Sequence, residues 1–399
     1  MGPNQQQSAV VLPDDSLEKH PETERKLKIL YVSHSLPPKE QPLKSVGGMQ
    51  NVSMQLMEAL KRRQDIETYT IIQRAPWKGI GIATTLFLFR LLWEIPKAVE
   101  KHKPDVILFS SMVTSGVIPF LTNRINVPMV TINHGKDVTL PLRIYQNFLL
   151  PRVFKKLDGV ISVSNATRDA CIERGMSPEK GVALPNGLDD NKLNGDLAKK
   201  EARKMLSEKF NINLKNSDYL LLTVGRLVKR KGHSWFVKEV LPRLDHNVNY
   251  LVIGDGPEFD NIHLAAEDSG VGLSTFLLGR QPEEILEIAY AASDLFVMPN
   301  IPVEGDMEGF GIVLLEANQV GLPAVAADLE GIQDVIAQGV NGFRVPHSRP
   351  DLFAQKVNQV LEKDLEELSE KSREYVIKQF SWDSVVDQYL NFLQKIVLH

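Results

Sequence analysis

The chain has 399 residues, more than the roughly 250–300 at which a single hydrophobic core usually stops growing, so two domains are expected. Hydrophobic residues make up 43% of the sequence and charged residues 24%, which excludes a disordered or fibrous protein, and the net charge of −4 disfavours a general binder of nucleic acid. The single cysteine, Cys171, excludes a framework of internal disulfides and favours a cytoplasmic location.

The N-terminal segment 1–26 is polar and charged, and it contains no apolar stretch long enough for a signal peptide. We therefore expect a disordered tail there. The most apolar run of the chain is 79–89, and Arg90 and Glu94 follow it closely. Because a transmembrane helix needs ~18–20 mostly apolar residues, the sequence predicts none.

Short apolar runs predict the strands of a first domain over 27–190. Segments with helical spacing separate them, such as the one that contains Met54, Met57 and Leu60. Continuous apolar strands that alternate with helices indicate a parallel sheet with helices on both faces. The predicted strands of this domain are 27–32, 68–72, 106–109, 129–132, 160–163 and 181–184.

The same alternation restarts after a polar stretch, 191–217, which is predicted to be a linker with a surface helix near 202–209. A second domain follows over 218–380, so the predicted fold class is α/β with two tandem Rossmann-like, doubly wound domains. Residues 381–399 have the apolar spacing of an amphipathic helix that needs a surface to cover. The predicted strands of the second domain are 219–224, 248–253, 275–278, 295–298, 323–326 and 342–345.

Ligands of open parallel sheets bind beyond the carboxyl ends of the strands, so residues there are candidates for a site. In the first domain, Gly47 and Gly48 open a helix, where backbone N–H groups approach a phosphate closely. His134 follows the predicted strand 129–132. A merely flexible loop and a purely structural histidine are the alternatives.

Two segments of the second domain carry charge at the same kind of position. A run of residues directly after the first strand begins with Arg226, ends with Lys231 and holds four cations. This concentration of positive charge is suited to binding a phosphate group. Glu308 precedes 309–311 and an apolar helix that contains Glu316. A carboxylate in such a helix needs a partner, and two sugar hydroxyls are good donors to it. The alternatives are a solvated basic loop and a salt bridge to a core cation.

The segment 308–316 resembles the Glu-x7-Glu signature of retaining nucleotide-sugar glycosyltransferases of family 4, which have the GT-B fold. The same family is matched in order by Gly47-Gly48, by 185–187, by 225–232 and by 253–257. The resemblance covers the chain from about residue 27 onward. It implies that the first domain binds the acceptor, that the second binds the nucleotide sugar, and that the C-terminal helix crosses back to the first domain.

The resemblance also implies roles for individual residues. Arg226 and Lys231 would neutralise the diphosphate of the donor, and Glu316 would hold its ribose hydroxyls. Glu308 would lie beside the anomeric carbon, with His134 as the active-site histidine near the donor sugar. The other donor-binding residues that it implies are Gly47, Gly48, Asn165, Arg280, Gly309, Phe310 and Gly311, with Arg280 at the edge of the nucleobase.

The implied reaction moves a hexosyl unit from a nucleoside-diphosphate sugar to a hydroxyl of a glycan, a glycolipid or a small molecule, with same-face attack and retention. No Asp-x-Asp motif is present in the sequence, so fixed cations rather than a metal are expected to stabilise the leaving diphosphate, and no cofactor is expected. An oxygen-ligand metal site formed by Glu304, Asp306 and Glu308 is the alternative.

Two other functions stay open at this point: another GT-B enzyme, such as a nucleotide-sugar epimerase or a phosphorylase, and a non-catalytic sugar-nucleotide-binding protein. No motif indicates the acceptor. The aromatic stretch 77–93 predicts either a core helix or an interfacial helix that contacts lipid at the inner face of a membrane. Because the candidate donor ligands are split between two domains, we expect closure about hinges near 185–218 and before Ser381 when donor binds.

Overall fold

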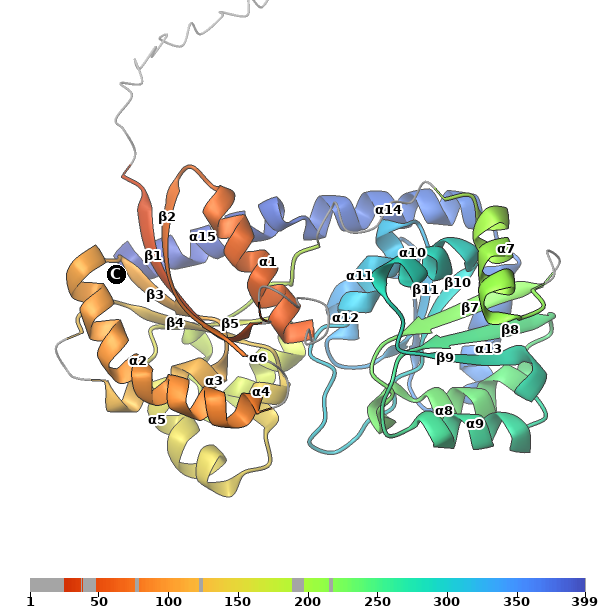
Figure 1. Cartoon of the computed structure of the whole chain (residues 1–399), viewed down its shortest axis with the longest axis horizontal. Coiled ribbons are helices and arrows are strands. Elements are labelled where there is room, and N and C mark those ends of the chain that lie inside the picture. The colour runs from red at the N-terminus through yellow and green to blue at the C-terminus, as the bar shows by residue number, and fades with distance from the viewer. Residues whose placement is uncertain are drawn as a thin grey trace, which may run out of the picture.

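Each half of the chain forms a six-stranded sheet in which all neighbouring strands are parallel (Figure 1). The computed structural model describes residues 25–36, 38, 48–75, 79–121, 125–188, 197–214 and 218–398. Gly47 and Trp77 lie outside these residues, as does most of the predicted N-terminal tail. The two doubly wound α/β units confirm the predicted fold class.

The first sheet has the strand order β2-β1-β3-β4-β5-β6. Its strands are β1 (Leu27–Leu36), β2 (Ile66–Arg74), β3 (Val106–Phe109), β4 (Met129–Asn133), β5 (Gly159–Ser162) and β6 (Gly181–Ala183). All four residues of β3 are buried, as expected of a central parallel strand that helices cover on both faces. The order reverses between β1 and β3, which places a crevice at the carboxyl ends of these two strands.

The second sheet has the order β12-β11-β10-β7-β8-β9, which reverses between β7 and β10. Its strands are β7 (Tyr219–Val224), β8 (Val248–Ile253), β9 (Thr275–Gly279), β10 (Leu295–Met298), β11 (Ala324–Asp328) and β12 (Gly342–Pro346). Each predicted strand of either domain overlaps an observed one. The predictions succeeded because buried parallel strands are continuous apolar runs.

Helices cover both faces of each sheet. The α-helices are α1 (Gly48–Arg62), α2 (Ile80–His102), α3 (Met112–Ser115), α4 (Lys136–Thr139), α5 (Leu150–Lys156), α6 (Asn165–Ile172), α7 (Lys199–Phe210), α8 (His233–Trp235), α9 (Phe259–Asp268), α10 (Glu283–Ala292), α11 (Ile312–Gln319), α12 (Ile332–Val335), α13 (Pro350–Leu361), α14 (Leu365–Phe380) and α15 (Trp382–Leu398). Shorter turns are η2 (Ile118–Phe120), η3 (Tyr145–Leu149), η4 (Pro178–Lys180), η5 (Lys229–Lys231), η6 (Phe236–Val240), η7 (Leu241–Arg243) and η8 (Gly272–Ser274).

The C-terminal helix α15 crosses back to the first domain, as the GT-B resemblance implied, and lies against α1 (Figure 1). Trp382 begins it, and the indole Nε1–H donates to Gln55 Oε1 of α1 at 3.2 Å. The Trp382 ring packs so close to Gly187 that a Cβ on this glycine would lie 2.2 Å from it. The backbone N–H of Leu188 also donates to Phe380 O at 2.6 Å. The chain crosses between the domains at these two neighbouring points.

The stretch predicted as a linker, 191–217, contains α7, which packs on α10 of the second domain. The buried guanidinium of Arg203 forms an ion pair with Asp294 and donates to Ala292 O at 3.0 Å. This helix is therefore part of the packed second domain rather than an isolated surface helix. Among the described residues, no helix is both long and apolar enough to cross a membrane.

Candidate functional site

The two domains touch at the loops that follow β4 and β10. A Cβ on Gly309 would lie 2.2 Å from His134 O, and a Cβ on Gly135 would lie 3.3 Å from Gly309 Cα. Gly135 also has φ +95°, a conformation that an L side chain rarely adopts. Glycine at both positions therefore lets the backbones of the two domains approach directly.

Polar contacts fasten this junction on either side. Lys136 Nζ lies 3.3 Å from Asp306 Oδ1, which joins α4 to the loop after β10. Asn165, the first residue of α6, donates its backbone N–H to Asp334 Oδ2 at 3.1 Å and its amide Nδ2–H to Asp334 Oδ1 at 2.5 Å. Asn165 thus contacts α12 of the opposite domain, and its predicted role toward donor stays a prediction.

A buried ion pair lies at the carboxyl ends of β7 and β10, the strands between which the order of the second sheet reverses. Lys231 Nζ is 2.6 Å from Glu308 Oε2, and each residue is only 7% exposed. Arg230 Nη2 lies 3.6 Å from the same oxygen, and Asn300 Nδ2–H donates to it at 3.1 Å. The sequence singled out Lys231 and Glu308 separately, and the fold brings them into contact.

The cations determine the charge state of Glu308. Burial by itself acts to raise the pKa of this carboxyl, but the charges of Lys231 and Arg230 and the hydrogen bonds from Lys231 and Asn300 outweigh it, so the pKa lies below its ordinary value of 4.5. Glu308 is therefore an anion near neutral pH. A buried charge is tolerated only when it is paired and hydrogen-bonded, and this one is both.

His134 follows β4 and lies beside the junction. Its Nε2 is 2.9 Å from the carbonyl oxygen of Ser110, and its backbone N–H donates to Asp137 Oδ1 at 2.9 Å. Since a carbonyl only accepts, the ring must carry a proton on Nε2, so in the neutral form of the ring Nδ1 is the acceptor. The buried His34 is a near neighbour, and burial, assisted by the charge of His134, lowers its pKa to about 4.

The other predicted site residues differ in their exposure and in their contacts. Arg226 and Arg280, which follow β7 and β9, are exposed, and Gly48 begins α1. Glu316 in α11 is half-buried and accepts from Tyr290 Oη–H at 3.2 Å. The ring of Phe310 packs in the core against Phe380, with a centroid distance of 6.1 Å. Of the predicted pair of cations, only Lys231 therefore contacts Glu308.

Four further residues of this site were not predicted from the sequence. Arg230 was seen only as part of a basic run, while Asn300, Glu330 and Asp334 were not singled out. Asn300 lies two residues beyond β10, and Glu330 lies two residues beyond β11. The rule that ligands meet the carboxyl ends of parallel strands, applied to every strand, would have indicated both.

The three carboxylates proposed as an alternative metal site are arranged differently from a metal site. Asp306 faces Lys136 and lies 3.8 Å from Arg230, Glu308 faces Lys231, and Glu304 is exposed. Within the described ranges, no three His, Cys, Asp or Glu side chains form a group that could hold a metal ion.

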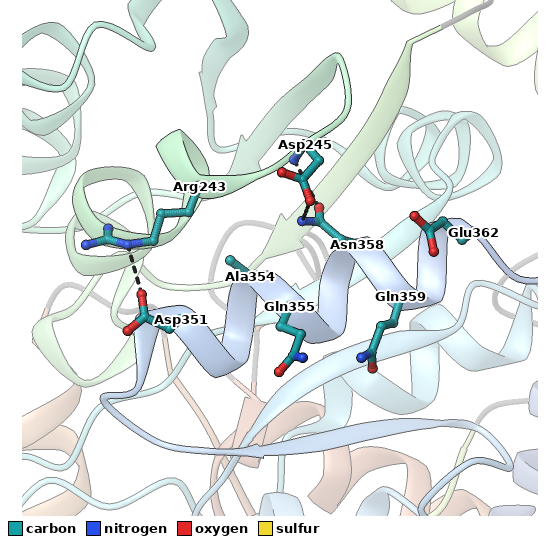
Figure 2. A pocket seen from close by; sticks show the side chains of 8 residues that line it. All are labelled: Arg243, Asp245, Asp351, Ala354, Gln355, Asn358, Gln359 and Glu362. Carbon is teal, nitrogen blue, oxygen red and sulfur yellow. Dashed lines mark hydrogen bonds and ion pairs between the residues drawn. The ribbon is translucent and has the colours of Figure 1, made fainter.

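A hollow on the second domain is lined by α13 and by the segment that carries Arg243 and Asp245 (Figure 2). Its polar groups pair with one another: Arg243 Nε lies 3.2 Å from Asp351 Oδ1, and Asn358 Nδ2–H donates to Asp245 Oδ2 at 2.6 Å. No predicted site residue lines it.

Comparisons with known proteins agree with this arrangement. Residues 46–192 match the family described as Glycosyltransferase Family 4, and residues 205–379 match Glycosyl transferases group 1. The chain therefore belongs to the family 4 glycosyltransferases. Such an enzyme takes its sugar from a nucleotide-sugar donor.

Individual relatives of this glycosyltransferase are about a quarter identical to it over the aligned residues. It is 25% identical over 359 residues to the GDP-mannose-dependent alpha-(1-6)-phosphatidylinositol monomannoside mannosyltransferase of Mycolicibacterium smegmatis, covering 84% of this chain and 89% of that one. It is 27% identical to the uncharacterized glycosyltransferase MJ1607 of Methanocaldococcus jannaschii, over 58% of either chain.

Solved structures show the same fold. Anabaena Alr3699/HepE in complex with UDP and glucose superposes with a TM-score of 0.69 at 19% identity, over 92% of this chain and all of that one. The catalytic domain of Starch Synthase IV from Arabidopsis thaliana, bound to ADP and acarbose, gives 0.71 at 16% identity, over 94% of this chain and all of that one.

Replacing Lys231 by Met in this glycosyltransferase should lower the free energy of unfolding by about 3–5 kcal/mol, because Glu308 would lose its closest counter-charge in a buried position. The double variant Lys231→Met/Glu308→Gln should recover most of this loss, and Lys229→Met, at an exposed cation, should be neutral. Urea titrations of the four proteins measure the differences. A Lys231→Met protein as stable as Lys229→Met would contradict the structural role of the pair.

The same pair gives a pH dependence. Because the folded pKa of Glu308 is depressed, its stabilising contribution is complete above the ordinary carboxyl pKa of 4.5 and is lost as the pH falls toward the lower folded value. The difference in the free energy of unfolding between the wild type and the single variant Glu308→Gln should therefore shrink below pH 4.5, as measured by urea titrations of these two proteins at several pH values.

Proposed function

We propose that this glycosyltransferase moves a hexosyl unit, with retention of configuration, from a nucleoside-diphosphate sugar to a hydroxyl acceptor. The observation that carries the proposal is the set of cations beside Glu308 at the carboxyl edge of the second sheet. Lys231 and Arg230 surround the Glu308 carboxylate there, and Arg226 follows the neighbouring strand β7. A departing diphosphate needs such positive charge in a site that excludes water.

The cations and the carboxylate have complementary roles in this mechanism. Breaking the bond between the sugar and the phosphate builds negative charge on the diphosphate, which Lys231 and Arg226 stabilise. It builds positive charge at the anomeric carbon, beside which the Glu308 anion is placed. The acceptor attacks from the face that the leaving group vacates, and a phosphate oxygen takes the proton of its hydroxyl, so no protein nucleophile is assigned.

The remaining predicted residues bind the donor. Glu316 accepts hydrogen bonds from the ribose hydroxyls, in the place where Tyr290 now donates to it. The backbone N–H groups at Gly48 and at 309–311 face the diphosphate and the sugar, Arg280 lies at the nucleobase, and His134 faces the sugar with its Nδ1. Gly47, which lies outside the described residues, is proposed as a further donor-binding residue. The first domain, 27–190 with helix 381–399, binds the acceptor, and the second, 218–380, binds the donor.

The names of two relatives favour a lipid-linked acceptor. One is named for GDP-mannose and a phosphatidylinositol mannoside, and another for the transfer of galactose from UDP-Gal to a diphosphoundecaprenol-linked sugar. A glycolipid or a glycan is therefore the proposed acceptor. A panel of UDP-, GDP- and ADP-sugars would identify the base and the sugar of the donor.

The test is an incubation of the wild type with UDP-, GDP- and ADP-sugars, with and without glycolipid and glycan acceptors, with detection of the released nucleoside diphosphate and of the anomeric configuration of the product by NMR. We expect a retained configuration and activity that EDTA leaves unchanged. Arg226→Ala should lower turnover roughly 10²-fold without lowering the melting temperature, because its side chain is exposed. Lys229→Ala is the matched control. An inverted product, or equal turnover in both variants, would contradict the mechanism.

We also propose that the protein is cytoplasmic and that its first domain docks on the inner face of an anionic membrane. Helix α2 buries Phe87, Leu91 and Ile95 but exposes the stripe that contains Ile82 (73% exposed) and Trp93 (63%). The core alternative for 77–93 therefore describes the buried side of this helix, and the interfacial alternative would use its exposed side. The exposed apolar residues of α2, η2 and the segment 140–148 are Ile82, Leu86, Phe89, Trp93, Phe120, Leu140, Leu142, Ile144 and Phe148.

Two observations favour a lipid surface over a protein partner. The inner sides of α2, η2 and α5 belong to one hydrophobic cluster, so these elements cover the same face of the first sheet, and their exposed residues lie on one side of the domain. The segment 138–157 carries Arg143, Arg152, Lys155 and Lys156 and no acidic residue, and all four cations are exposed. Apolar side chains among unopposed cations match the interface of an anionic bilayer.

Co-sedimentation with vesicles tests the docking. The wild type should pellet with phosphatidylglycerol-containing vesicles, weakly with phosphatidylcholine alone, and less as salt rises. Ile144→Ser/Phe148→Ser should abolish pelleting. The control Leu264→Ser/Leu273→Ser removes two exposed leucines of the second domain and should pellet like the wild type. Equal pelleting of the two double variants would contradict the proposal.

A further inference from the structure

Glu330 adopts a backbone conformation that its residue type disfavours. Its φ is +49°, in the left-handed region where a Cβ crowds the following carbonyl and glycine is preferred. Among the described residues, the other non-glycine residues with positive φ are Lys103, Asn211 and Ser348, and the first two of these cap the C-termini of α2 and α7. Glu330 instead lies at the carboxyl end of β11, beside the candidate active site.

The side chain of Glu330 accounts for a glutamate at this position. Its Oε2 accepts the backbone N–H of Glu308 at 2.5 Å, and the N–H of the next residue, Gly331, donates to Glu308 O at 3.1 Å. A Cβ on Gly331 would lie 2.2 Å from Gly309 O, so the two chain segments are in direct contact. Both backbone polar groups of Glu308 are thus held by consecutive residues of one turn.

Helix α12, which follows this turn directly, contacts the other domain. Asp334, four residues farther on, accepts both hydrogen bonds from Asn165 of α6. The loop that carries Glu308 therefore lies between the first domain, which reaches it through Gly135 and Lys136, and a turn that is fastened to the first domain by Asp334. A backbone strain that persists beside a site is a reason to look for function there.

We propose that Glu330 is a positioning residue that holds the Glu308 loop, and that the segment 330–334, which runs from this turn into α12, completes this hold when the two domains are closed. The inference rests on the proposed function, in which Glu308 must face the anomeric carbon. Glu330 acts through the backbone of Glu308 rather than on substrate. Its contribution depends on a hydrogen-bond acceptor at the end of its side chain.

Three variants separate the acceptor from the backbone conformation. Glu330→Gly removes the acceptor and relieves the unfavourable φ. Glu330→Ala removes the acceptor but keeps the unfavourable φ, and Glu330→Gln keeps both an acceptor oxygen and the unfavourable φ. We expect kcat to fall about tenfold or more in the Gly and Ala variants and to stay within about threefold of wild type in the Gln variant. The melting temperature should instead be lowest in the Ala variant.

The pattern distinguishes a positioning role from a purely structural one. If kcat follows the melting temperature, or if Glu330→Gly keeps wild-type kcat, the inference is wrong. A Gln variant as impaired as the Gly variant would also overturn it. Hydrogen exchange of the peptide that contains Glu308 gives a readout that needs no turnover: exchange should accelerate in the Gly and Ala variants and not in the Gln variant. Absence of activity in the wild type would count against the proposed function alone.

A double-mutant cycle tests the connection to domain closure. Asp334→Ala removes both hydrogen bonds to Asn165. Because Glu330 and Asp334 act through one short segment, we expect the combined acceleration of hydrogen exchange in Glu330→Ala/Asp334→Ala to be clearly less than the product of the two single accelerations. Accelerations that multiply would show that the two contacts are independent and would overturn the second half of the proposal.

Discussion

The buried ion pair between Lys231 and Glu308 is the interaction on which the organisation of this site depends. Two charges taken out of water are stable only with close partners, and here Arg230 and Asn300 lie beside the same oxygen of the Glu308 carboxylate as Lys231. The pair joins loops from β7 and β10, which are neighbours in the sheet although Lys231 and Glu308 are far apart in the sequence. The strand order therefore brings them together at the point where ligands of such sheets bind.

The same pair links the interface between the domains to the chemistry. The loop of Glu308 contacts the first domain through Gly309 and Asp306. The backbone of Glu308 itself contacts the turn after β11. The two domains thus touch at the residues proposed to contact donor sugar. Movement about the crossings near Gly187 and Trp382 would open this junction and carry Glu308 away from His134, so closure and the assembly of the site are one event in this account.

The sequence predicted the architecture well because the relevant signals are local. Buried parallel strands such as β3 are uninterrupted apolar runs, and α15 has a clear apolar face, so neither depends on distant contacts. The GT-B resemblance supplied the direction of the C-terminal helix. It also indicated Lys231 and Glu308 as functional residues, one from each of two motifs.

The pairing of side chains was much less predictable. Arg226 and Lys231 lie in one basic run, but the turn η5 carries Lys231 inward while Arg226 stays exposed, and no periodicity in the sequence encodes this difference. Glu330 belongs to none of the recognised motifs, and its importance appears only with its positive φ and its hydrogen bond to Glu308. Asp334 likewise has a meaning only once α6 of the other domain is beside it.

The most direct test of this account is calorimetric titration of the product nucleoside diphosphate into wild type, Glu308→Gln, Lys231→Met and the double variant. If Glu308 holds Lys231 in place for the diphosphate, Glu308→Gln should weaken binding when Lys231 is present. It should strengthen binding in the Lys231→Met background, where Glu308 is only a repelling charge. An effect of Glu308→Gln with the same sign and size in both backgrounds would contradict the central claim.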